Sequence, residues 1–339
     1  MIGAAVVGCG RWGTNYVRAL GQVPGIELRA CCDPLESRLA GAGRLAPSAR
    51  LTPSYEALLA AGDIAAIVVA SPATLHFQQA FAALQAGKHV LVEKPLTLSV
   101  AEADALVELA RRQGLVLMVG HTMVYNEGVR CLREAIRSPE FGTIYYLHSV
   151  RTNLGPIRED VSAVWDLAPH DLSIFAYLLD AWPERVSAVG ADVLRQGRED
   201  VAFITLSYPG GVVGHVTVSW LDPSKNRQVV VVGSRRRALF DDLNNAEQVR
   251  LFDKGIALDN SFQTFGEFHY LVRDGDIHSP KIEAREPLLT QCQHFFQCVR
   301  DGTEPITGPE HGRQMVRALA AVTRSLRAGG APVDLASSS

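Results

Sequence analysis

The run Gly8-Cys9-Gly10-Arg11-Trp12-Gly13 decides the fold of this chain. It directly follows an apolar stretch at residues 2–7 and leads into a segment with helical spacing at residues 12–20. Between a strand and a helix, three such glycines allow a tight turn, close approach of the backbone to a pyrophosphate, and close packing of helix on strand. The run therefore predicts a dinucleotide site, with a purely structural turn as the alternative. The candidate cofactor-binding residues are Gly8, Gly10, Arg11, Trp12 and Gly13.

An acidic residue strengthens this interpretation. Asp33 stands 20 residues after Gly13, at the end of the next apolar run, where a carboxylate accepts hydrogen bonds from the adenosine ribose hydroxyls. Because a carboxylate repels the 2′-phosphate of NADP, Asp33 favours NAD as the cofactor. NADP stays possible, since the nearby Arg38 could move in and pair with a phosphate.

The first 120 residues alternate short apolar runs with longer segments of helical period, which is typical of βαβ units and a parallel sheet. The runs are rich in Val, Ile and Leu at odd and even positions alike, as strands covered on both faces must be. The predicted strands are residues 2–7, 26–32, 64–70, 89–92 and 115–119, and the predicted helices are residues 12–20, 54–60, 74–86 and 99–113.

The composition changes after residue 120, because only 5 of the 24 aromatic residues precede it. The later apolar runs, at residues 143–151, 185–194, 201–208, 212–220 and 228–233, alternate with polar residues, which favours antiparallel strands with one covered face. Helices are expected at residues 127–138, 165–179, 288–300 and 309–327. We therefore expect an α/β chain with a dinucleotide-binding domain at 1–120, an α+β domain at 121–328 and a flexible tail at 329–339.

Composition also excludes several classes of protein. The 339 residues are 47% apolar and 20% charged, as in folded globular chains, and a net charge of −3 offers no footprint for nucleic acid. Six cysteines without a CxxC pair predict reduced thiols and a cytoplasmic protein. We expect no secretion signal and no membrane span, since no segment approaches the roughly 18 consecutive apolar residues that a membrane helix needs.

A second motif, Glu93-Lys94-Pro95, follows the predicted strand at residues 89–92. Ligands of open parallel sheets bind at the carboxyl ends of the strands. Beside a bound nicotinamide, burial and the positive ring would disfavour the ammonium form of Lys94 and suit it to exchange a proton with a carbinol. A loop lysine paired with Glu93 is the competing interpretation.

A third motif places Asp166, Pro169 and His170 at the start of a predicted helix. Because proline is tolerated only in the first turn, Pro169 predicts that His170 lies near the helix N-terminus, where the dipole keeps imidazole neutral and basic. Asp166 precedes His170 by four residues and faces the same way if the helix includes it. A histidine with a carboxylate neighbour is a usual general base. A capping aspartate with a surface histidine is one alternative; a metal site is another, although no third ligand appears at a recognisable spacing.

These motifs together resemble the glucose-fructose oxidoreductase and inositol dehydrogenase family (Gfo/Idh/MocA). The resemblance rests on the glycine run, on Ser71-Pro72-Ala73-Thr74-Leu75-His76, and on Ala86-Gly87-Lys88-His89-Val90-Leu91-Val92-Glu93-Lys94-Pro95. It covers about residues 1–327 and implies an N-terminal Rossmann domain with a doubly wound parallel sheet, a C-terminal domain with a large, mostly antiparallel open sheet, and a sugar or polyol pocket between them. It implies catalytic roles for Lys94 and His170, with Asp166 as acidic partner. It also implies cofactor contacts from Ser71, Pro72, His76, Glu93 and Lys94.

A finer resemblance concerns the substrate. Gly120-His121-Thr122-Met123-Val124-Tyr125-Asn126 and the segments 151–160 and 166–173 resemble the branch that oxidises the 3-hydroxyl of nucleotide sugars such as UDP-N-acetylhexosamines. The candidate substrate contacts are then Tyr125, Asn126, Asn153, Arg158, Asp166 and His170. Arg151 is a further candidate that competes with a solvated charge, and a helix cap competes for Tyr125 and Asn126. Family members often carry glycine at the position of Ala168 and aspartate at that of Ser173.

We therefore expect an NAD(P)-dependent dehydrogenase that oxidises a secondary hydroxyl of a sugar, with Lys94 and His170 handling the carbinol proton. The alternatives are an inositol or free-sugar dehydrogenase, an enzyme that retains its cofactor and returns the hydride, and a non-catalytic sugar sensor with a dinucleotide fold. The resemblance also implies a homodimer or homotetramer packed through the exposed sheet face. Nucleic-acid and membrane partners and a bound metal are not expected.

Overall fold

The computed structural model describes residues 1–259 and 269–335, and these form two compact units. The first unit comprises Met1–Tyr125 together with Arg285–Ala320. The second unit comprises Asn126–Ala284 and the chain from Ala321 onward. Within the described residues, no helix has the length and apolar character that crossing a membrane requires.

A six-stranded sheet forms the centre of the first unit, with all its ladders parallel and the strand order β3-β2-β1-β4-β5-β6. The strands are β1 (Ile2–Val7), β2 (Ile26–Cys32), β3 (Arg50–Thr52), β4 (Ala66–Val69), β5 (His89–Glu93) and β6 (Leu117–Gly120). The order reverses between β1 and β4, which is the switch point where doubly wound sheets bind dinucleotides. The predicted Rossmann fold is therefore confirmed.

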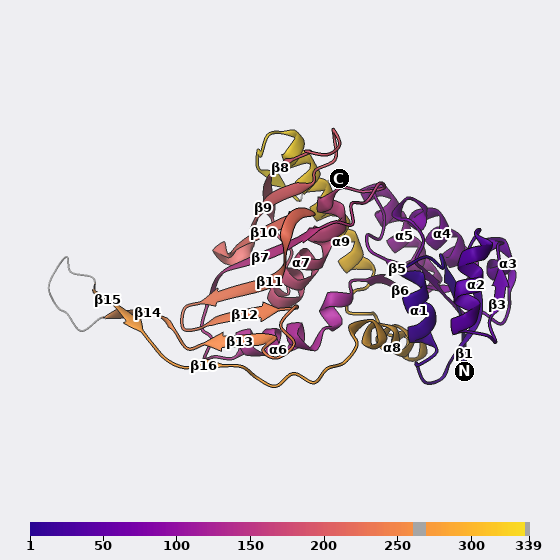
Figure 1. Ribbon diagram of the computed structural model, residues 1–339, viewed down its shortest axis with the longest axis horizontal. Helices are drawn as coiled ribbons and strands as arrows, with labels where there is room; N and C mark the ends of the chain where they lie inside the picture. Colours follow the sequence, from indigo (N-terminus) through magenta and orange to yellow (C-terminus); the bar gives the residue numbers. More distant parts are fainter. Residues whose placement is uncertain (260–268, 336–339) are drawn as a thin grey trace. The chain divides into compact units, whose positions relative to one another are not determined.

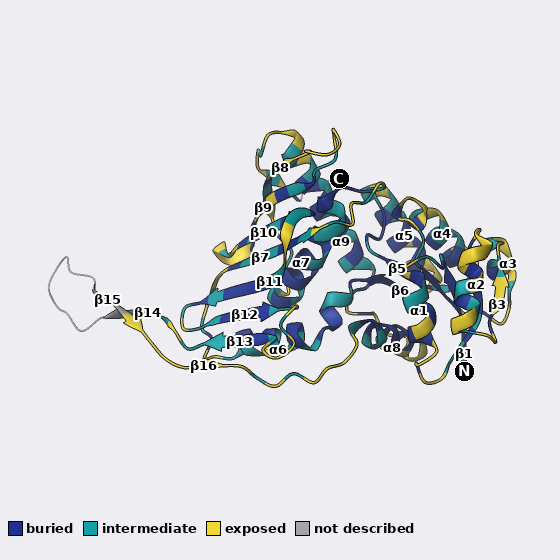
Figure 2. Cartoon of the chain, viewed as in Figure 1, coloured by how far each residue is buried: buried dark blue, intermediate teal, exposed yellow. Residues whose placement is uncertain are grey.

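Helices pack on this sheet, and β4 and β6 are buried along their whole length. The ribbon at the label β6 is dark blue in Figure 2. The helices are α1 (Gly13–Leu20), α2 (Glu36–Leu45), α3 (Tyr55–Ala60), α4 (Ala73–Gln85) and α5 (Val100–Gln113). Helix α5 is capped at both ends: Ser99 Oγ accepts from the Glu102 amide at 3.4 Å, and Gly114 ends the helix in the left-handed region. Sequence patterning did not predict α2 or β3.

Two elements from the end of the chain join the first unit. They are α8 (Pro287–Asp301) and the first part of α9 (Pro309–Arg327). Their contacts are specific: Gln291 Nε2 donates to Tyr16 Oη at 2.8 Å, and Thr307 Oγ1 donates to the Val119 carbonyl at 2.7 Å. The C-terminal segment thus covers the parallel sheet beside β6.

A nine-stranded sheet forms the second unit, in the order β16-β13-β12-β11-β7-β10-β9-β8-β17 (Figure 1). Every ladder is antiparallel except the β10–β7 pair, which confirms the predicted mostly antiparallel sheet. Its strands are β7 (Ile144–Leu154), β8 (Arg185–Ala191), β9 (Val201–Ser207), β10 (Val213–Ser219), β11 (Leu221–Gly233), β12 (Arg237–Asp241), β13 (Val249–Phe252), β16 (Ile277–His278) and β17 (Val333–Asp334). A separate hairpin joins β14 (Gly255–Asp259) to β15 (His269–Arg273).

One face of this sheet is covered by α6 (Glu127–Arg137) and α7 (Ala163–Leu179). Along β9 the side chains alternate between buried and exposed, as strands with one covered face require. The segment predicted as a flexible tail contains β17, which pairs with β8, while residues 336–339 lie outside the described residues.

Candidate functional site

The carboxyl edge of the parallel sheet gathers the predicted residues of the first unit. Gly8 follows β1, Ser71 and Pro72 follow β4, and Glu93 ends β5, with Lys94 next to it. Parallel strands end at one edge of a sheet, so segments far apart in the sequence become neighbours there. The glycine-rich loop, residues 8–13, lies at this edge between β1 and α1 (Figure 1).

The glycines of this loop meet different constraints. Gly8 has φ +86°, and a Cβ on Gly13 would lie 1.7 Å from the Gly8 carbonyl oxygen, so only glycine fits at either position. A Cβ on Gly10 would meet only Arg38, at 3.9 Å, so the protein itself leaves the space above Gly10 open. Helix α1 begins here without an acidic residue in its first turn. The loop therefore suits a bound pyrophosphate, because the backbone above Gly10 is open and the first turn of the helix carries no acidic residue of its own.

Asp33 lies at the end of β2 with only 1% of its surface exposed. Its Oδ2 accepts from the Cys9 amide at 2.8 Å, and its Oδ1 accepts from the Leu35 amide at 2.9 Å. Arg38 Nη1 lies 3.6 Å from Oδ2. Asp33 thus holds the glycine-rich loop in shape. The sequence had predicted only ribose recognition for this residue.

His76 joins the two loops that follow β4 and β5. Its ring is buried near the start of α4, with Nδ1 2.7 Å from the Pro95 carbonyl oxygen and Nε2 3.0 Å from that of Ser71. Ser71 Oγ donates to Gln79 Oε1 at 2.6 Å. These contacts give His76 a structural role between the two loops, beside the cofactor contact that the resemblance implied.

Helix α7 carries the predicted residues of the second unit, Asp166 and His170, which lie one turn apart as expected. The prediction that Pro169 stands in the first turn is wrong, because the helix begins at Ala163, six residues earlier. Proline inside a helix costs about 3 kcal/mol through one lost hydrogen bond and a steric clash. Burial of apolar residues such as Leu172 and Phe175 offsets that cost. The N-terminal dipole is therefore no argument for a neutral His170.

The guanidinium of Arg158 donates hydrogen bonds to two carboxylates. Its Nε donates to Asp160 Oδ1 at 2.8 Å, and its Nη1 donates to Asp166 Oδ1 at 3.0 Å. Asp166 is therefore held by Arg158 on one side while it lies a turn from His170. Asn153, on β7, donates through its side-chain amide to the Gly155 carbonyl.

Asp171, the residue after His170, forms a buried ion pair that the sequence did not predict. Arg151 on β7 binds Asp171 on α7 in a bidentate manner, at 2.7 and 3.1 Å, and both side chains are at most 6% exposed. Burial raises the pKa of Asp171, and the Arg151 guanidinium opposes that shift. Alternation along β7 was the available signal, since it puts Arg151 on the same covered side as Leu147. Ser173 Oγ, from the next turn, donates to the His170 carbonyl at 2.8 Å.

Tyr125 and Asn126 have partners within their own units. Tyr125 is fully buried, and its Oη lies 3.2 Å from Thr307 Oγ1. Asn126 Oδ1 accepts from the Gly128 amide at 2.8 Å, so the helix-capping alternative for Asn126 is confirmed. Asn126 Nδ2 donates to Oδ1 of Asp242, and Oδ2 of Asp242 accepts from Arg227.

His121 adjoins Lys94, because the residues before them, Gly120 and Glu93, pair across β6 and β5. Its ring is 5.1 Å from that of His311 on α9. Neither ring nitrogen of His121 has a hydrogen-bond partner among the described residues. Burial lowers the pKa of His121 well below its usual value, with smaller contributions from His311 and Lys94, and burial lowers the pKa of His311 to about 4.

These two histidines predict a loss of stability in acid. Both rings stay neutral in the folded chain but take up a proton near pH 6.5 when unfolded, so the stability they contribute is present above that pH and lost below it. Each ring contributes a slope of up to about 1.4 kcal/mol per pH unit. We expect urea unfolding at pH 7.5 and 5.0 to show this loss, and His121→Phe to remove about half of it. An unchanged slope in His121→Phe, with the exposed His278→Phe as control, would contradict the assignment.

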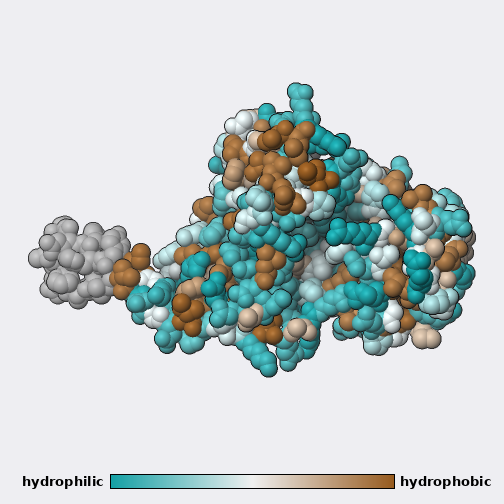
Figure 3. Space-filling view, viewed as in Figure 1, coloured by the Kyte–Doolittle hydropathy of each residue, from teal (hydrophilic) through white to brown (hydrophobic). Residues whose placement is uncertain are grey.

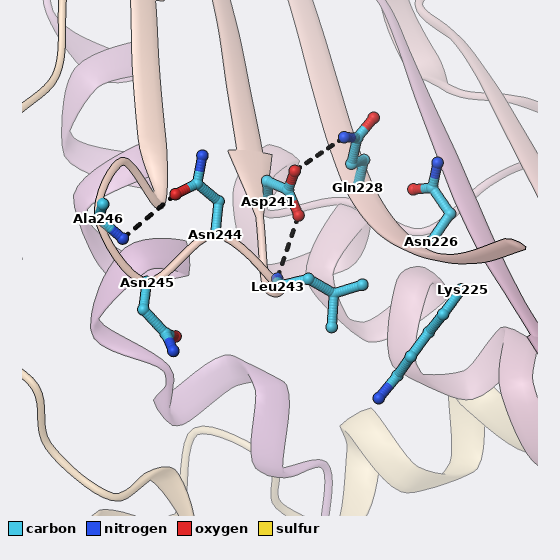
Figure 4. Close-up of a pocket in the computed structure, with 8 residues that line it drawn as sticks. All are labelled: Lys225, Asn226, Gln228, Asp241, Leu243, Asn244, Asn245 and Ala246. Carbon is cyan, nitrogen blue, oxygen red and sulfur yellow. Dashed lines mark hydrogen bonds between the residues drawn. The ribbon is translucent and has the colours of Figure 1, made fainter.

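A polar hollow of about 480 Å³ lies elsewhere in the second unit, at the start of β11 and the turn after β12 (Figure 4). Gln228 Nε2 donates to Asp241 Oδ2 at 2.8 Å, and Asn244 Oδ1 accepts from the Ala246 amide at 3.2 Å. The hollow contains none of the predicted site residues, and these polar groups hold the turn itself in shape.

Comparison with protein families gives two matches. Residues 2–121 match the model described as "Oxidoreductase family, NAD-binding Rossmann fold", and residues 129–238 match the GFO/IDH/MocA C-terminal domain. The two matches fall in the first and second units respectively, in the order that the motifs predict.

Curated relatives include dehydrogenases of a nucleotide sugar and of inositols, and also hydratases of 2,7-anhydro-N-acetylneuraminate. The chain is 35% identical to the UDP-N-acetylglucosamine 3-dehydrogenase of Acidithiobacillus ferrooxidans over 58% of this chain and 61% of that protein, less than two thirds of its length. It is 29% identical to the scyllo-inositol 2-dehydrogenase (NAD(+)) of Bacillus subtilis over 98% of this chain and 95% of that protein. A solved structure of the Acidithiobacillus enzyme has a TM-score of 0.82 at 26% identity, covering 97% of this chain and 98% of that one.

Proposed function

The chain belongs to the Gfo/Idh/MocA family of NAD-binding oxidoreductases, and from this premise we propose that it oxidises a secondary hydroxyl of a sugar. The observation that carries the proposal is the carboxyl edge of the parallel sheet, where the glycine-rich loop and Lys94 follow strands on the two sides of the switch point. When bound, nicotinamide supplies the hydride acceptor.

The residues of the chain then handle binding and the proton. The glycine-rich loop holds the pyrophosphate, and Ser71, Pro72 and the His76 bridge shape the wall beside it. Lys94 and His170 share the proton that leaves the carbinol hydroxyl, so that the oxygen is free to form a carbonyl as hydride departs. Asp166 orients His170 from one turn away, while Arg158 fixes Asp166.

We propose a nucleotide sugar as substrate, oxidised at its 3-position. The support is the relative named UDP-N-acetylglucosamine 3-dehydrogenase. The scyllo-inositol dehydrogenase, which matches almost the whole chain, supports an inositol or free sugar as the second candidate. The carboxylate partners of Arg151 and Arg158 weigh against these two arginines as phosphate ligands, because an engaged guanidinium has fewer donors to offer.

A turnover screen tests this proposal. Purified protein would be incubated with NAD or NADP and with free sugars, sugar phosphates, inositols and nucleotide sugars, and NADH release would be followed at 340 nm. We expect stoichiometric NADH with a nucleotide sugar. Product formed without net NADH would indicate a retained cofactor, and tight dinucleotide binding without turnover of any sugar would indicate a sensor instead.

Asp33 is proposed to select NAD over NADP. In Asp33→Ser the repulsion of a 2′-phosphate is removed and Arg38 is released to pair with it, so we expect the ratio of NADH to NADPH affinity to fall about tenfold, or ~1.4 kcal/mol. Fluorescence titration of both reduced dinucleotides measures the ratio without any substrate. Glu36→Ser, an acid three residues away, is the matched control. Equal ratios in Asp33→Ser and the unmodified protein would count against this role.

We propose a homo-oligomer that packs through the open face of the nine-stranded sheet. Tyr146, Val189, Phe203 and Val213 share this face by strand register, and each is 44–52% exposed. Apolar side chains gather over the region of β8 and β9 in Figure 3. Exposed apolar patches of this kind mark interfaces. Light scattering should show a dimer or tetramer for the unmodified chain and a smaller species for Phe203→Lys, whereas a monomeric unmodified chain would refute the proposal.

A cytoplasmic location is proposed on the evidence of the thiols. All six cysteines are free, and Cys9, Cys31 and Cys32 are buried together near the glycine-rich loop. Free thiols persist where the compartment is reducing. Mass spectrometry of the protein alkylated directly from its host should find six unpaired thiols.

A further inference from the structure

We propose that Glu93 is a positioning residue that fixes Lys94 and couples it to the glycine-rich loop through Trp12. This inference rests on the proposed function, in which Lys94 handles the carbinol proton. The sequence had placed Glu93 among the cofactor contacts, whereas its contacts within the protein point to a different task.

Both carboxylate oxygens of Glu93 are used inside the first unit. Oε1 accepts from Trp12 Nε1 at 2.6 Å and from Tyr16 Oη at 2.5 Å, and Oε2 accepts from the Lys94 amide at 3.1 Å. Only 6% of Glu93 is exposed. Three donors converge on one carboxylate, which is the arrangement that favours its ionised form.

The protein makes room for this carboxylate. Gly120 is the register partner of Glu93 on β6, and a Cβ there would lie 2.8 Å from Glu93 Oε1 and 3.0 Å from Tyr16 Oη. Tyr16 Oη in turn accepts from Gln291 Nε2 at 2.8 Å, and Gln291 Oε1 accepts from Thr122 Oγ1 at 2.9 Å. The network therefore links α1, β5, α8 and the residues after β6, and a fully satisfied buried network holds its members in one geometry.

Trp12 connects this network to the loop. Its indole nitrogen is bonded to Glu93 although the two residues are 81 positions apart, while 45% of Trp12 is exposed. A dinucleotide seated on the loop meets the residue that holds Glu93, and Glu93 holds the backbone of Lys94. Occupancy of the loop and placement of the lysine are thereby joined through two hydrogen bonds.

The charges of Glu93 and Lys94 also favour this arrangement. Burial raises the pKa of Glu93, while the Tyr16 hydroxyl and the Lys94 charge oppose that shift. The other titratable groups that act on this site are Tyr16 on α1 and Cys292 on α8 for Glu93, and His121 after β6 for Lys94. Burial raises the pKa of Tyr16 and Cys292 and lowers that of His121, so all three stay neutral near pH 7. Lys94 is thus the cation that gains from the Glu93 charge.

The decisive variant is Glu93→Gln. We expect kcat to fall about 10- to 100-fold, because the lysine is displaced, while NADH affinity stays within about threefold. Asp104→Asn, which removes a carboxylate from the Arg313 and Arg317 pairs on the same unit, is the matched control and should change neither quantity.

A second variant and a spectroscopic readout keep the inference independent of folding and of substrate. Trp12→Phe keeps a ring on the loop but lacks the donor, and it should lower kcat by a smaller factor than Glu93→Gln does. Lys94 is one of five lysines, so its backbone amide ¹⁵N resonance can be assigned with Lys94→Ala and observed without substrate. In Glu93→Gln this resonance should broaden, because the carboxylate that holds the amide in one geometry is removed.

The outcomes separate the two proposals. Absent turnover on every sugar, together with a broadened Lys94 amide resonance in Glu93→Gln, would reject the proposed function and keep the coupling. Unchanged kcat and an unbroadened Lys94 amide resonance in Glu93→Gln would reject the coupling whatever the substrate. Loss of NADH binding equal to the loss of kcat would return Glu93 to the role of a cofactor ligand and also overturn the inference.

Discussion

Replacement of Lys94 by alanine is expected to lower turnover by about a hundred- to ten-thousandfold, the range that a proton-transfer group contributes. Lys94 directly follows β5 at the carboxyl edge, and its amide is held by Glu93. Removal of its amine takes away a group that carries the carbinol proton but leaves the glycine-rich loop intact. NADH affinity should therefore change little, as measured by fluorescence titration.

His170→Ala belongs to the same experiment. It should show the same pattern of lost kcat with retained NADH binding, because the imidazole is the second carrier of the proton in the proposed mechanism. Lys254→Ala and His278→Ala, at exposed positions of the second unit, are the matched controls. Turnover at the unmodified rate in either Lys94→Ala or His170→Ala would remove that residue from the mechanism.

Asp171→Ala is expected to lower the free energy of unfolding by about 3–5 kcal/mol, because it leaves the charge of Arg151 buried without its partner. The pair lies directly beside His170, so any remaining folded protein should also lose turnover. Urea unfolding followed by tryptophan fluorescence measures the loss, since Trp165 and Trp220 both belong to the second unit.

A double variant separates the effect of the unpaired charge from the effect of packing. Arg151→Met combined with Asp171→Leu replaces the ions by apolar groups of similar size, and most of the lost stability should return. Recovery of stability without recovery of turnover would assign the ion pair to the placement of His170. A double variant as unstable as Asp171→Ala would show that packing, rather than the unpaired charge, causes the loss.

Local patterns predicted the first unit well, and the reasons are physical. The strand, the glycine-rich loop and Asp33 lie within about thirty residues, and Gly13 is required by a contact inside that segment, the one with the Gly8 carbonyl. Periodicity placed the strands to within a few residues, because strands covered on both faces must be apolar throughout. The Ser99 cap and the Gly114 stop depend on neighbouring residues alone.

Patterns failed where a distant partner decides. Pro169 stands inside α7 because the buried apolar residues of that helix offset the lost hydrogen bond, which a rule about single residues omits. Arg151 and Arg158, both candidate substrate contacts, are paired with Asp171, Asp160 and Asp166, which no local pattern predicted. Tyr125, a third candidate, is buried beside Thr307, from the far end of the chain.

The sequence by itself determined the dinucleotide fold and the family, and it named Lys94 as a candidate catalytic residue. This was possible because the glycine-rich loop and the Glu93-Lys94-Pro95 run are motifs of consecutive residues. Only the tertiary structure decided what Glu93, His76, Arg151 and Asp171 do. Their roles consist of hydrogen bonds and ion pairs to other elements, and Trp12 and Gln291 reach one network from opposite ends of the chain. Such contacts exist only after folding has closed the intervening loops.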